Sequence, residues 1–155
     1  MHIPSPFPHR FAAGNAPPPG AAGLGDRLGR EPPLGRRVAI VEDEMMVAWS
    51  LETMVEDLGY EMVGIFPRGE AALAAITPDG VDIVLMDLNL GGGMDGVETA
   101  RRLREADNVR IIFISAYADP ATRARVTAEV PGALLLRKPV SAARLAQALD
   151  PRRAG

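Results

Sequence analysis

Short apolar runs alternate with segments of helical periodicity through most of the chain. Each run predicts a strand, and the segment after it carries apolar residues every three or four positions, which is typical of a helix with one buried face. The predicted strands are Val38–Val41, Glu61–Phe66, Val81–Met86, Ile111–Ile114 and Ala133–Leu136. The predicted helices are a segment with Val47, Leu51, Met54, Val55 and Leu58 on one face that ends at Gly59, then Gly69–Ile76, a segment carrying Val97, Ala100 and Leu103, Asp119–Glu129, and a last one marked by Leu145, Ala148 and Leu149.

This order gives five strand–helix units in about 115 residues. Strands that are almost wholly apolar are typical of a parallel sheet with both faces covered. Right-handed crossovers then produce a doubly wound α/β sandwich. In such sheets ligands bind at the carboxyl ends of the strands, where the strand order reverses.

The first 35 residues differ from the rest, since they hold eight prolines and six glycines and show no apolar periodicity. We expect a disordered tail over residues 1–35, a folded domain over 36–150 and a short tail over 151–155. A solvated extension or a start codon assigned too early explains the first tail most simply. A docking peptide is the alternative.

Composition narrows the possible functions. The chain of 155 residues fits one domain, has no cysteine, and has histidine only at His2 and His9, so neither a thiolate metal site nor a histidine-based active site is expected in the domain. Residues 36–150 hold 12 basic and 18 acidic residues, a net charge of −6, which argues against a nucleic-acid partner. No apolar stretch is long enough for a membrane span or a signal peptide, so we expect a cytoplasmic protein.

Polar residues end the predicted strands. Glu42 and Asp43 follow the first strand, Asp87 the third and Ser115 the fourth, while Lys138 lies just after the fifth. Because parallel strands end at one edge of the sheet, these side chains should meet in one crevice.

Carboxylates that converge in this way repel one another unless a cation joins them, and oxygen ligands suit Mg²⁺. A hydroxyl and an ammonium beside the metal suit a phosphoryl group, so we expect phosphoryl transfer with a carboxylate nucleophile. Lys138 is the only lysine beside 16 arginines, which favours a functional role over chance. For Asp43 or Glu44 an alternative stays open, since either could merely cap the next helix.

Five short motifs in this order resemble the receiver domain of two-component response regulators, of the single-domain, stand-alone type. They are Val41-Glu42-Asp43-Glu44, Met86-Asp87-Leu88-Asn89, Met94-Asp95-Gly96, Ile114-Ser115-Ala116 and Lys138-Pro139. The resemblance covers residues 36–150 and implies a flavodoxin-like (βα)5 fold with a parallel sheet in the strand order 2-1-3-4-5. It implies Asp43 as a direct Mg²⁺ ligand with Asp87, Glu42 as a ligand through water, and the backbone carbonyl of Asn89 as a further ligand.

The resemblance also implies Asp87 as the phosphoacceptor, Ser115 as the switch hydroxyl and Lys138 as the cation that pairs with the phosphoryl group. The donor would be a phosphohistidine on a histidine kinase or a histidine phosphotransfer protein. The receiver would catalyse only its own phosphorylation and dephosphorylation, and would signal by protein contact or serve as a relay or sink. Its downstream target is unknown, and a monomer or weak homodimer is expected.

Three departures from the family pattern matter. The loop after Asp87 is glycine-rich and one residue longer than in many members, and Leu135 stands where an aromatic residue is frequent. The chain ends five residues after Asp150, so no output domain is expected. We expect the signal to leave mainly through the loop from Ser115 to Asp119, which contains Tyr117, and through the polar helix that follows it, rather than through strand five. The alternative is that Leu135 is plain core and Tyr117 a solvated loop residue.

Two other functions compete. A Mg²⁺-dependent phosphatase with an aspartyl-phosphate intermediate would need a second acid two residues after the nucleophile, where this chain has Asn89. A flavodoxin-like cofactor binder would need a hydroxyl- or glycine-rich turn after the first strand, where this chain is acidic.

Overall fold

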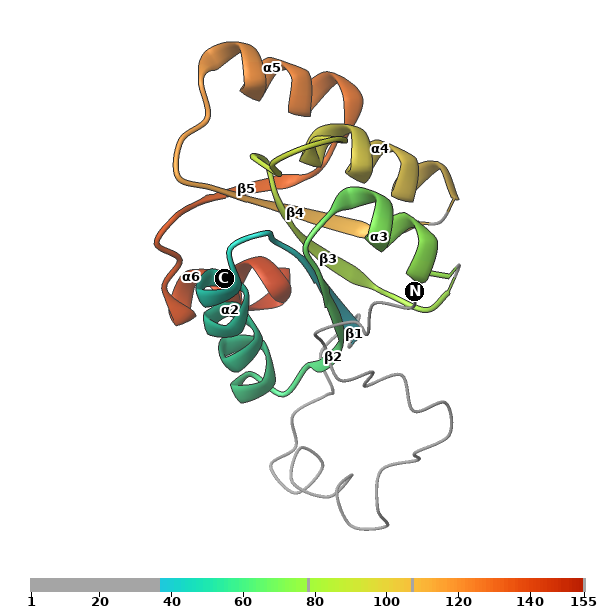
Figure 1. Ribbon diagram of the computed structural model, residues 1–155. Coiled ribbons are helices and arrows are strands. Elements are labelled where there is room, and N and C mark those ends of the chain that lie inside the picture. Colours follow the sequence, from blue (N-terminus) through green and yellow to red (C-terminus); the bar gives the residue numbers. More distant parts are fainter. Residues whose placement is uncertain (1–36, 78, 107, 155) are drawn as a thin grey trace. The chain divides into compact units, whose positions relative to one another are not determined.

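The computed structural model describes residues 37–77, 79–106 and 108–154, so the tail predicted over residues 1–35 lies outside the described residues. Strands and helices alternate through this part of the chain (Figure 1). The strands are β1 (Arg37–Val41), β2 (Glu61–Phe66), β3 (Ile83–Asp87), β4 (Arg110–Ser115) and β5 (Leu134–Arg137). The helices are α2 (Met45–Asp57), α3 (Gly69–Ala75), α4 (Gly96–Ala106), α5 (Pro120–Glu129), α6 (Ala142–Leu149) and the 3₁₀ helix η1 (Pro151–Ala154).

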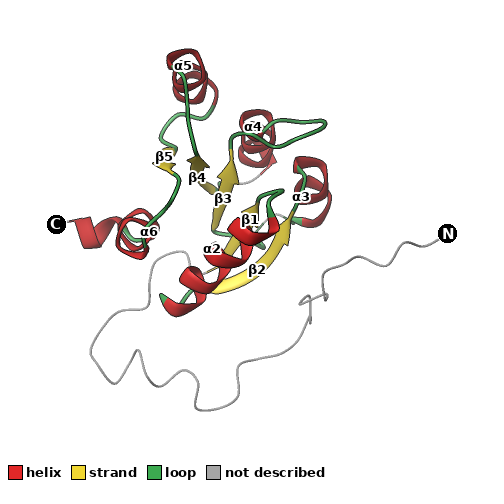
Figure 2. Ribbon diagram, turned by 60° about the vertical axis from the view of Figure 1, so that its left-hand side comes forward, coloured by secondary structure: helices red, strands yellow, loops and turns green. Residues whose placement is uncertain are grey.

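The five strands form one parallel sheet in the order β2-β1-β3-β4-β5, which confirms the predicted fold class and strand order. The first strand of the sequence therefore lies inside the sheet, between β2 and β3. The last strand, β5, lies at an edge beside β4 (Figure 2). The order reverses between β1 and β3, and ligands in such sheets bind at that point.

Each central strand contributes alternate side chains to two separate cores. In β3, Val84 and Met86 pack with α3, α4 and α5 on one face of the sheet, while Ile83 and Leu85 pack with α2 and α6 on the other. Figures 1 and 2 show this arrangement of helices about the sheet. Because both faces are covered, the central strands need apolar residues at every position, which explains the continuous apolar runs in the sequence.

The buried face of α2 differs in detail from the predicted one. Ala48, Leu51 and Val55 are buried, whereas Val47, Met54 and Leu58 lie only partly buried at the margins of this stripe. The prediction missed Ala48 because it weighted large apolar residues, whereas the small side chain of Ala48 is fully buried. On the outer face of α2, Met46 and Trp49 are exposed.

Capping residues define where the later helices begin. The Asp119 carboxylate accepts a hydrogen bond from the Thr122 amide at 2.7 Å, and the Ser141 hydroxyl accepts one from the Arg144 amide at 3.2 Å. These side chains satisfy backbone donors that the first helical turn leaves without partners. Within the described residues, no helix has the length and apolar character needed to cross a membrane.

Candidate functional site

Backbone hydrogen bonds hold the polar residues at the carboxyl edge of the sheet. The Glu42 amide donates to the Phe66 carbonyl at 3.0 Å, which extends the β1–β2 pairing by one residue. The Lys138 amide donates to the Ser115 carbonyl at 2.8 Å, which does the same for β4 and β5. Asp87 is itself the last residue of β3. Glu42, Asp87 and Lys138 therefore lie at the ends of hydrogen-bonded strands.

Three carboxylates meet at this edge, as the sequence predicted. Glu42, Asp43 and Asp87 each offer an oxygen, and the three oxygens lie within 4.8 Å of one another. Glu42 is 1% exposed and Asp87 is 4% exposed, whereas Asp43 faces solvent. The result is an acidic pocket that is open on the Asp43 side.

Lys138 reaches into this pocket from the end of β5. Its Nζ lies 3.0 Å from Glu42 Oε2 and 3.7 Å from Asp87 Oδ2. Although burial opposes the charged form, these two carboxylates raise the pKa of Lys138. The ammonium is therefore held charged between a carboxylate of β1 and the one that ends β3.

The buried Glu42 carboxylate has charges of both signs around it. Burial raises the pKa of its carboxyl to about 7, and repulsion from Asp87 acts in the same direction, while Lys138 and the Glu44 amide offset part of the effect. Glu42 Oε2 is buried and forms an ion pair with Lys138. It is the one buried side-chain N or O atom in the described residues that makes no aligned hydrogen bond. An additional cation would relieve this imbalance.

Asn89 and Ser115 link the acidic pocket to the loop after β4. The Asn89 amide donates to Asp87 Oδ1 at 3.0 Å, and its side-chain Nδ2 donates to Ser115 Oγ at 3.2 Å. Ser115 Oγ also donates to the Tyr117 carbonyl at 2.7 Å and accepts from the Tyr117 amide at 3.2 Å. The resemblance had implied only the backbone carbonyl of Asn89, so the bond from its side chain to Ser115 is new information.

Asp43 and Glu70 hold the two ends of the glycine-rich loop that follows β3. The Gly91 amide donates to Asp43 Oδ2 at 3.2 Å, and the Met94 amide donates to Glu70 Oε1 at 2.9 Å. Gly93 has a φ of +119°, and a Cβ there would lie 2.6 Å from Glu70 Oε1, so glycine is required at this position. No sequence signal pointed to Glu70, because an acidic residue in the first turn of a helix is commonplace.

The capping alternative for the acidic cluster is wrong. The residue before α2 is Glu44, and its side chain makes no capping hydrogen bond, while Asp43 bonds to Gly91 instead. Carboxylate capping occurs instead at α4, where Asp95 Oδ1 accepts from the Glu98 amide at 2.9 Å. The Asp43 carboxylate is therefore available to the pocket.

The residues present fit a divalent cation. Oxygens bound to one Mg²⁺ at about 2.1 Å lie roughly 3 to 4 Å apart, and the 4.8 Å limit on the three carboxylate oxygens is close to that range. The ligands are oxygens alone, one side of the site is open to water, and the buried Glu42 oxygen lacks an aligned hydrogen bond. Mg²⁺ typically keeps several waters in such a site.

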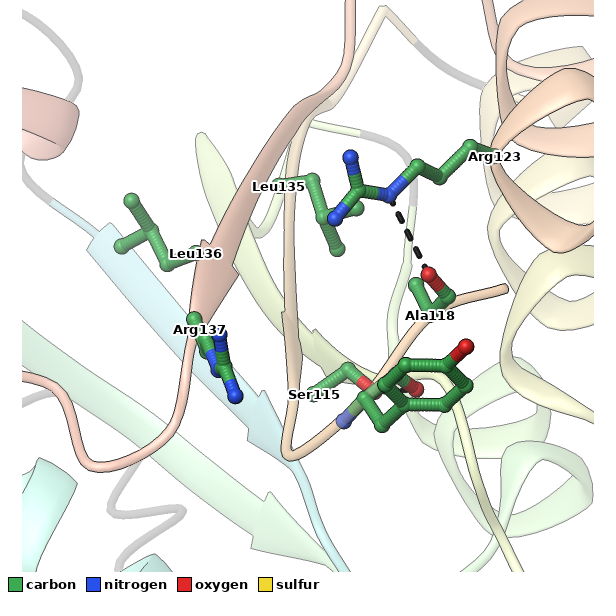
Figure 3. Close-up of a pocket in the computed structure, with 7 residues that line it drawn as sticks. Ser115, Ala118, Arg123, Leu135, Leu136 and Arg137 are labelled. Atoms are coloured by element: carbon green, nitrogen blue, oxygen red, sulfur yellow. Dashed lines mark hydrogen bonds between the residues drawn. The ribbon is translucent and has the colours of Figure 1, made fainter. Parts of the chain in front are cut away.

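Tyr117, which is expected to carry the signal, and Leu135, which is expected to respond less, both lie near Ser115. Tyr117 is 71% exposed in the loop after β4. Leu135 is half-buried in β5 and packs against the core on the α5 side of the sheet. Both line the same pocket as Ser115 (Figure 3).

Comparison with known proteins agrees with this geometry. Residues 38–150 match the family described as the response regulator receiver domain. The phyllosphere-induced regulator PhyR of Methylorubrum extorquens is 32% identical over 131 residues, which are 82% of this chain and 48% of that protein. The chain thus spans about half the length of that relative.

Solved structures that are similar to this chain include two receiver domains. The signal receiver domain of a modulated diguanylate cyclase from Desulfovibrio desulfuricans is 41% identical with a TM-score of 0.67, over 72% of this chain and 88% of that one. The receiver domain of the sensor histidine kinase PA1611 from Pseudomonas aeruginosa, with a magnesium ion in its active site cleft, is 26% identical with a TM-score of 0.61, over 75% and 98% of the chains. With its parallel sheet and its acidic pocket, the chain belongs to the response regulator receiver domain family.

Proposed function

We propose that the protein is a signalling switch that accepts a phosphoryl group from a phosphohistidine onto Asp87, with Mg²⁺ as cofactor. The supporting observation is the setting of Asp87, a carboxylate only 4% exposed that shares its pocket with two further carboxylates and lies 3.7 Å from the Lys138 ammonium. A buried aspartate with an ammonium and room for a cation suits a nucleophile toward phosphorus.

In the proposed transfer, a carboxylate oxygen of Asp87 attacks the phosphorus atom. A P–O bond forms, the P–N bond to the donor imidazole breaks, and the imidazole nitrogen keeps the electron pair and then takes a proton. Glu42, Asp43 and Asp87 would hold Mg²⁺, which when bound offsets negative charge on the phosphoryl oxygens. Hydrolysis by water later returns Asp87 to its free state.

Two side chains would hold the phosphoryl oxygens. Lys138 already lies close to Asp87 and would form an ion pair with one oxygen, loosening its contact with Glu42. Ser115 would donate its hydroxyl to another oxygen instead of to the Tyr117 carbonyl. A phosphatase with an aspartyl-phosphate intermediate would need a second acid at the position of Asn89, whose side-chain amide donates to Ser115 Oγ. Asn89 therefore favours a signalling switch over a phosphatase.

We further propose that the signal leaves through the loop of Ser115 and Tyr117. Both hydrogen bonds between these residues involve the Ser115 hydroxyl, so its movement toward a phosphoryl group frees the Tyr117 backbone. Leu135 has no polar atom in its side chain to exchange with solvent, and it would respond less.

The expected setting follows from this chemistry. Receiver domains interact with histidine kinases, and we propose a histidine kinase or a histidine phosphotransfer protein as donor, in the cytoplasm. The receiver unit would comprise residues 36–150, acting as a monomer or weak homodimer on an unidentified protein target.

Labelling with acetyl phosphate, a small phosphodonor, tests the proposal. In the presence of Mg²⁺ the protein should gain one acid-stable, base-labile phosphoryl group by intact mass. Asp87→Asn should abolish the gain, whereas Asp57→Asn, an exposed aspartate at the end of α2, should not. Labelling of Asp87→Asn at the rate of the unmodified protein, or full labelling in excess chelator, would refute the assignment.

A further inference from the structure

The glycine-rich loop between β3 and α4 is held by two carboxylates that come from different elements. Asp43, just after β1, accepts a hydrogen bond from the Gly91 amide at 3.2 Å. Glu70, in the first turn of α3, accepts one from the Met94 amide at 2.9 Å. Helices α3 and α4 lie side by side on one face of the sheet, which brings Glu70 to the far end of this loop (Figures 1 and 2). The loop thus connects α3 to the open side of the acidic pocket.

The backbone of this loop depends on external contacts for its order. Residues 91–93 are three consecutive glycines, and glycine loses more conformational freedom on folding than any other residue. Gly92 and Gly93 both have positive φ, of +61° and +119°. The Glu70 carboxylate lies against this backbone, since a Cβ on Gly93 would be only 2.6 Å from its Oε1. Loss of the contact with Glu70 would therefore loosen the segment that presents the Gly91 amide.

Glu70 is well suited to hold the loop but lies outside the cluster of three carboxylates. Hydrogen bonds from the Met94 amide and from its own amide lower the pKa of Glu70, and Arg68 and Arg102 act in the same direction. The carboxylate is therefore ionised at neutral pH, and an ionised acceptor makes the stronger hydrogen bond. Its oxygens are not among those that converge in the pocket. Glu70 can influence that pocket through the loop or through its charge, and these two routes can be separated by experiment.

The bond from Gly91 matters because Asp43 is the exposed member of the pocket. Glu42 and Asp87 are buried and are fixed by their surroundings, whereas Asp43 faces solvent. An ionised carboxylate has about four acceptor positions, so Asp43 can accept from the Gly91 amide and bind a cation at the same time. Mg²⁺ demands near-ideal octahedral geometry of its ligands. A side chain that is already oriented loses less conformational freedom when the cation binds, and the affinity is correspondingly higher.

We propose that Glu70 is a positioning residue for the metal site. By holding the Met94 amide it fixes the glycine-rich loop, and the Gly91 amide of that loop orients the Asp43 carboxylate toward a divalent cation. The inference deepens the proposed function, because it rests on the proposed use of Mg²⁺ and gives α3 a part in binding it. The route runs through two hydrogen bonds and four loop residues, so it predicts an effect on Mg²⁺ affinity from a side chain that binds no metal.

NMR on the full chain, labelled with ¹⁵N, tests this route in two steps. In the metal-free protein, Glu70→Ala should shift the Gly91 amide resonance. In a Mg²⁺ titration at constant ionic strength, followed at the Asp87 amide, the same variant should raise the Kd by about fivefold, equivalent to one hydrogen bond of about 1 kcal/mol. Glu70→Gln should keep both close to their values in the unmodified protein, because glutamine can still accept from Met94. Asp57→Ala is the matched control, since it removes an exposed carboxylate from the last residue of α2.

The outcomes separate this inference from the proposed function. An unchanged Gly91 resonance or an unchanged Kd in Glu70→Ala would overturn the inference and leave the proposed function intact. A loss of affinity as large in Glu70→Gln or in Asp57→Ala would also overturn it, because the effect would then belong to charge alone. If the unmodified protein binds no Mg²⁺, the inference and the proposed cofactor fail together. Unchanged circular dichroism of Glu70→Ala excludes misfolding as the cause of a loss.

Discussion

Helices α3 and α4 approach so closely at Gly69 that this position makes a sharp test of the packing. A Cβ on Gly69 would lie 2.0 Å from Thr99 Oγ1 and 3.1 Å from Thr99 Cβ. Thr99 is fully buried, and its hydroxyl donates to the Asp95 carbonyl at 2.7 Å. Gly69→Ala must therefore push the helices apart or rotate Thr99 away from its hydrogen bond.

The expected cost can be assembled from these contacts. Overpacking costs about 1–3 kcal/mol, and loss of the Thr99 hydrogen bond costs about 1 kcal/mol. The better helix propensity of alanine returns up to about 1 kcal/mol. We expect Gly69→Ala to destabilise the domain by about 2 kcal/mol net, which corresponds to a fall in Tm of roughly 8 °C or more for a domain of this size.

A double-mutant cycle in urea unfolding identifies the cause. Because Thr99→Ala removes the atom that clashes most, the double variant Gly69→Ala/Thr99→Ala should be about as stable as Thr99→Ala alone, with a coupling energy of about 2 kcal/mol. Gly96→Ala is the control, since its Cβ would lie 2.1 Å from the backbone oxygen of Asp87, which no side-chain truncation can move. If the costs of Gly69→Ala and Thr99→Ala simply add, the clash lies elsewhere and the reasoning fails.

Three further predictions concern the carboxylates. Mg²⁺ at one hundred times its Kd should stabilise the folded protein by about 2.7 kcal/mol and so raise its Tm. Asp43→Asn should remove most of this rise in differential scanning fluorimetry. An equal rise in both proteins would place the ion elsewhere. Glu70→Ala should speed hydrogen exchange of the Met94 backbone amide, measured by NMR, because the amide loses its acceptor. Glu70→Gln should not, because the side-chain oxygen of glutamine can still accept the hydrogen bond. Equal exchange rates in both variants would show that the bond is unimportant. For Asp95, burial opposes ionisation but the Arg125 guanidinium outweighs it and lowers the pKa of the carboxyl. A lowered pKa in the folded state stabilises the fold above the unfolded pKa of about 4 and loses that contribution as the pH falls through the folded value. Arg125→Gln should therefore lower the free energy of unfolding by up to about 1 kcal/mol at pH 7, since the ion pair with Asp95 is partly exposed. The difference in stability between the variant and the unmodified protein should shrink below about pH 4. A difference that does not change with pH would assign the effect to packing.

The sheet and the acidic pocket could be predicted from the sequence because local pattern and topology suffice for both. An apolar run that stops at Asp87 marks a strand end, and parallel strands bring such ends together without any knowledge of side-chain conformation. The predicted range of β2, Glu61–Phe66, coincides with the strand in the structure, because a turn at Gly59 and a polar segment after Phe66 bound it clearly.

The contacts that sequence could not supply all depend on the path of a loop. Glu70 meets Met94 across 24 positions, and the Asn89 side chain meets Ser115 across 26. Neither pair shows any periodicity, and each contains one residue of the loop that follows β3.

The position of β1 inside the sheet has a consequence for how the domain is completed during synthesis. Translation delivers Glu42 first and Asp87 well before Lys138, yet the strands that carry the two acids are neighbours, and Lys138 follows the edge strand made last. A nascent chain that has emerged only through β4 brings two buried carboxylates together without their ammonium. Docking of β5 therefore completes the sheet and brings Lys138 to the two carboxylates in one event. A ribosome-bound chain truncated before β5 should depend on divalent cations for compactness more than the finished protein does.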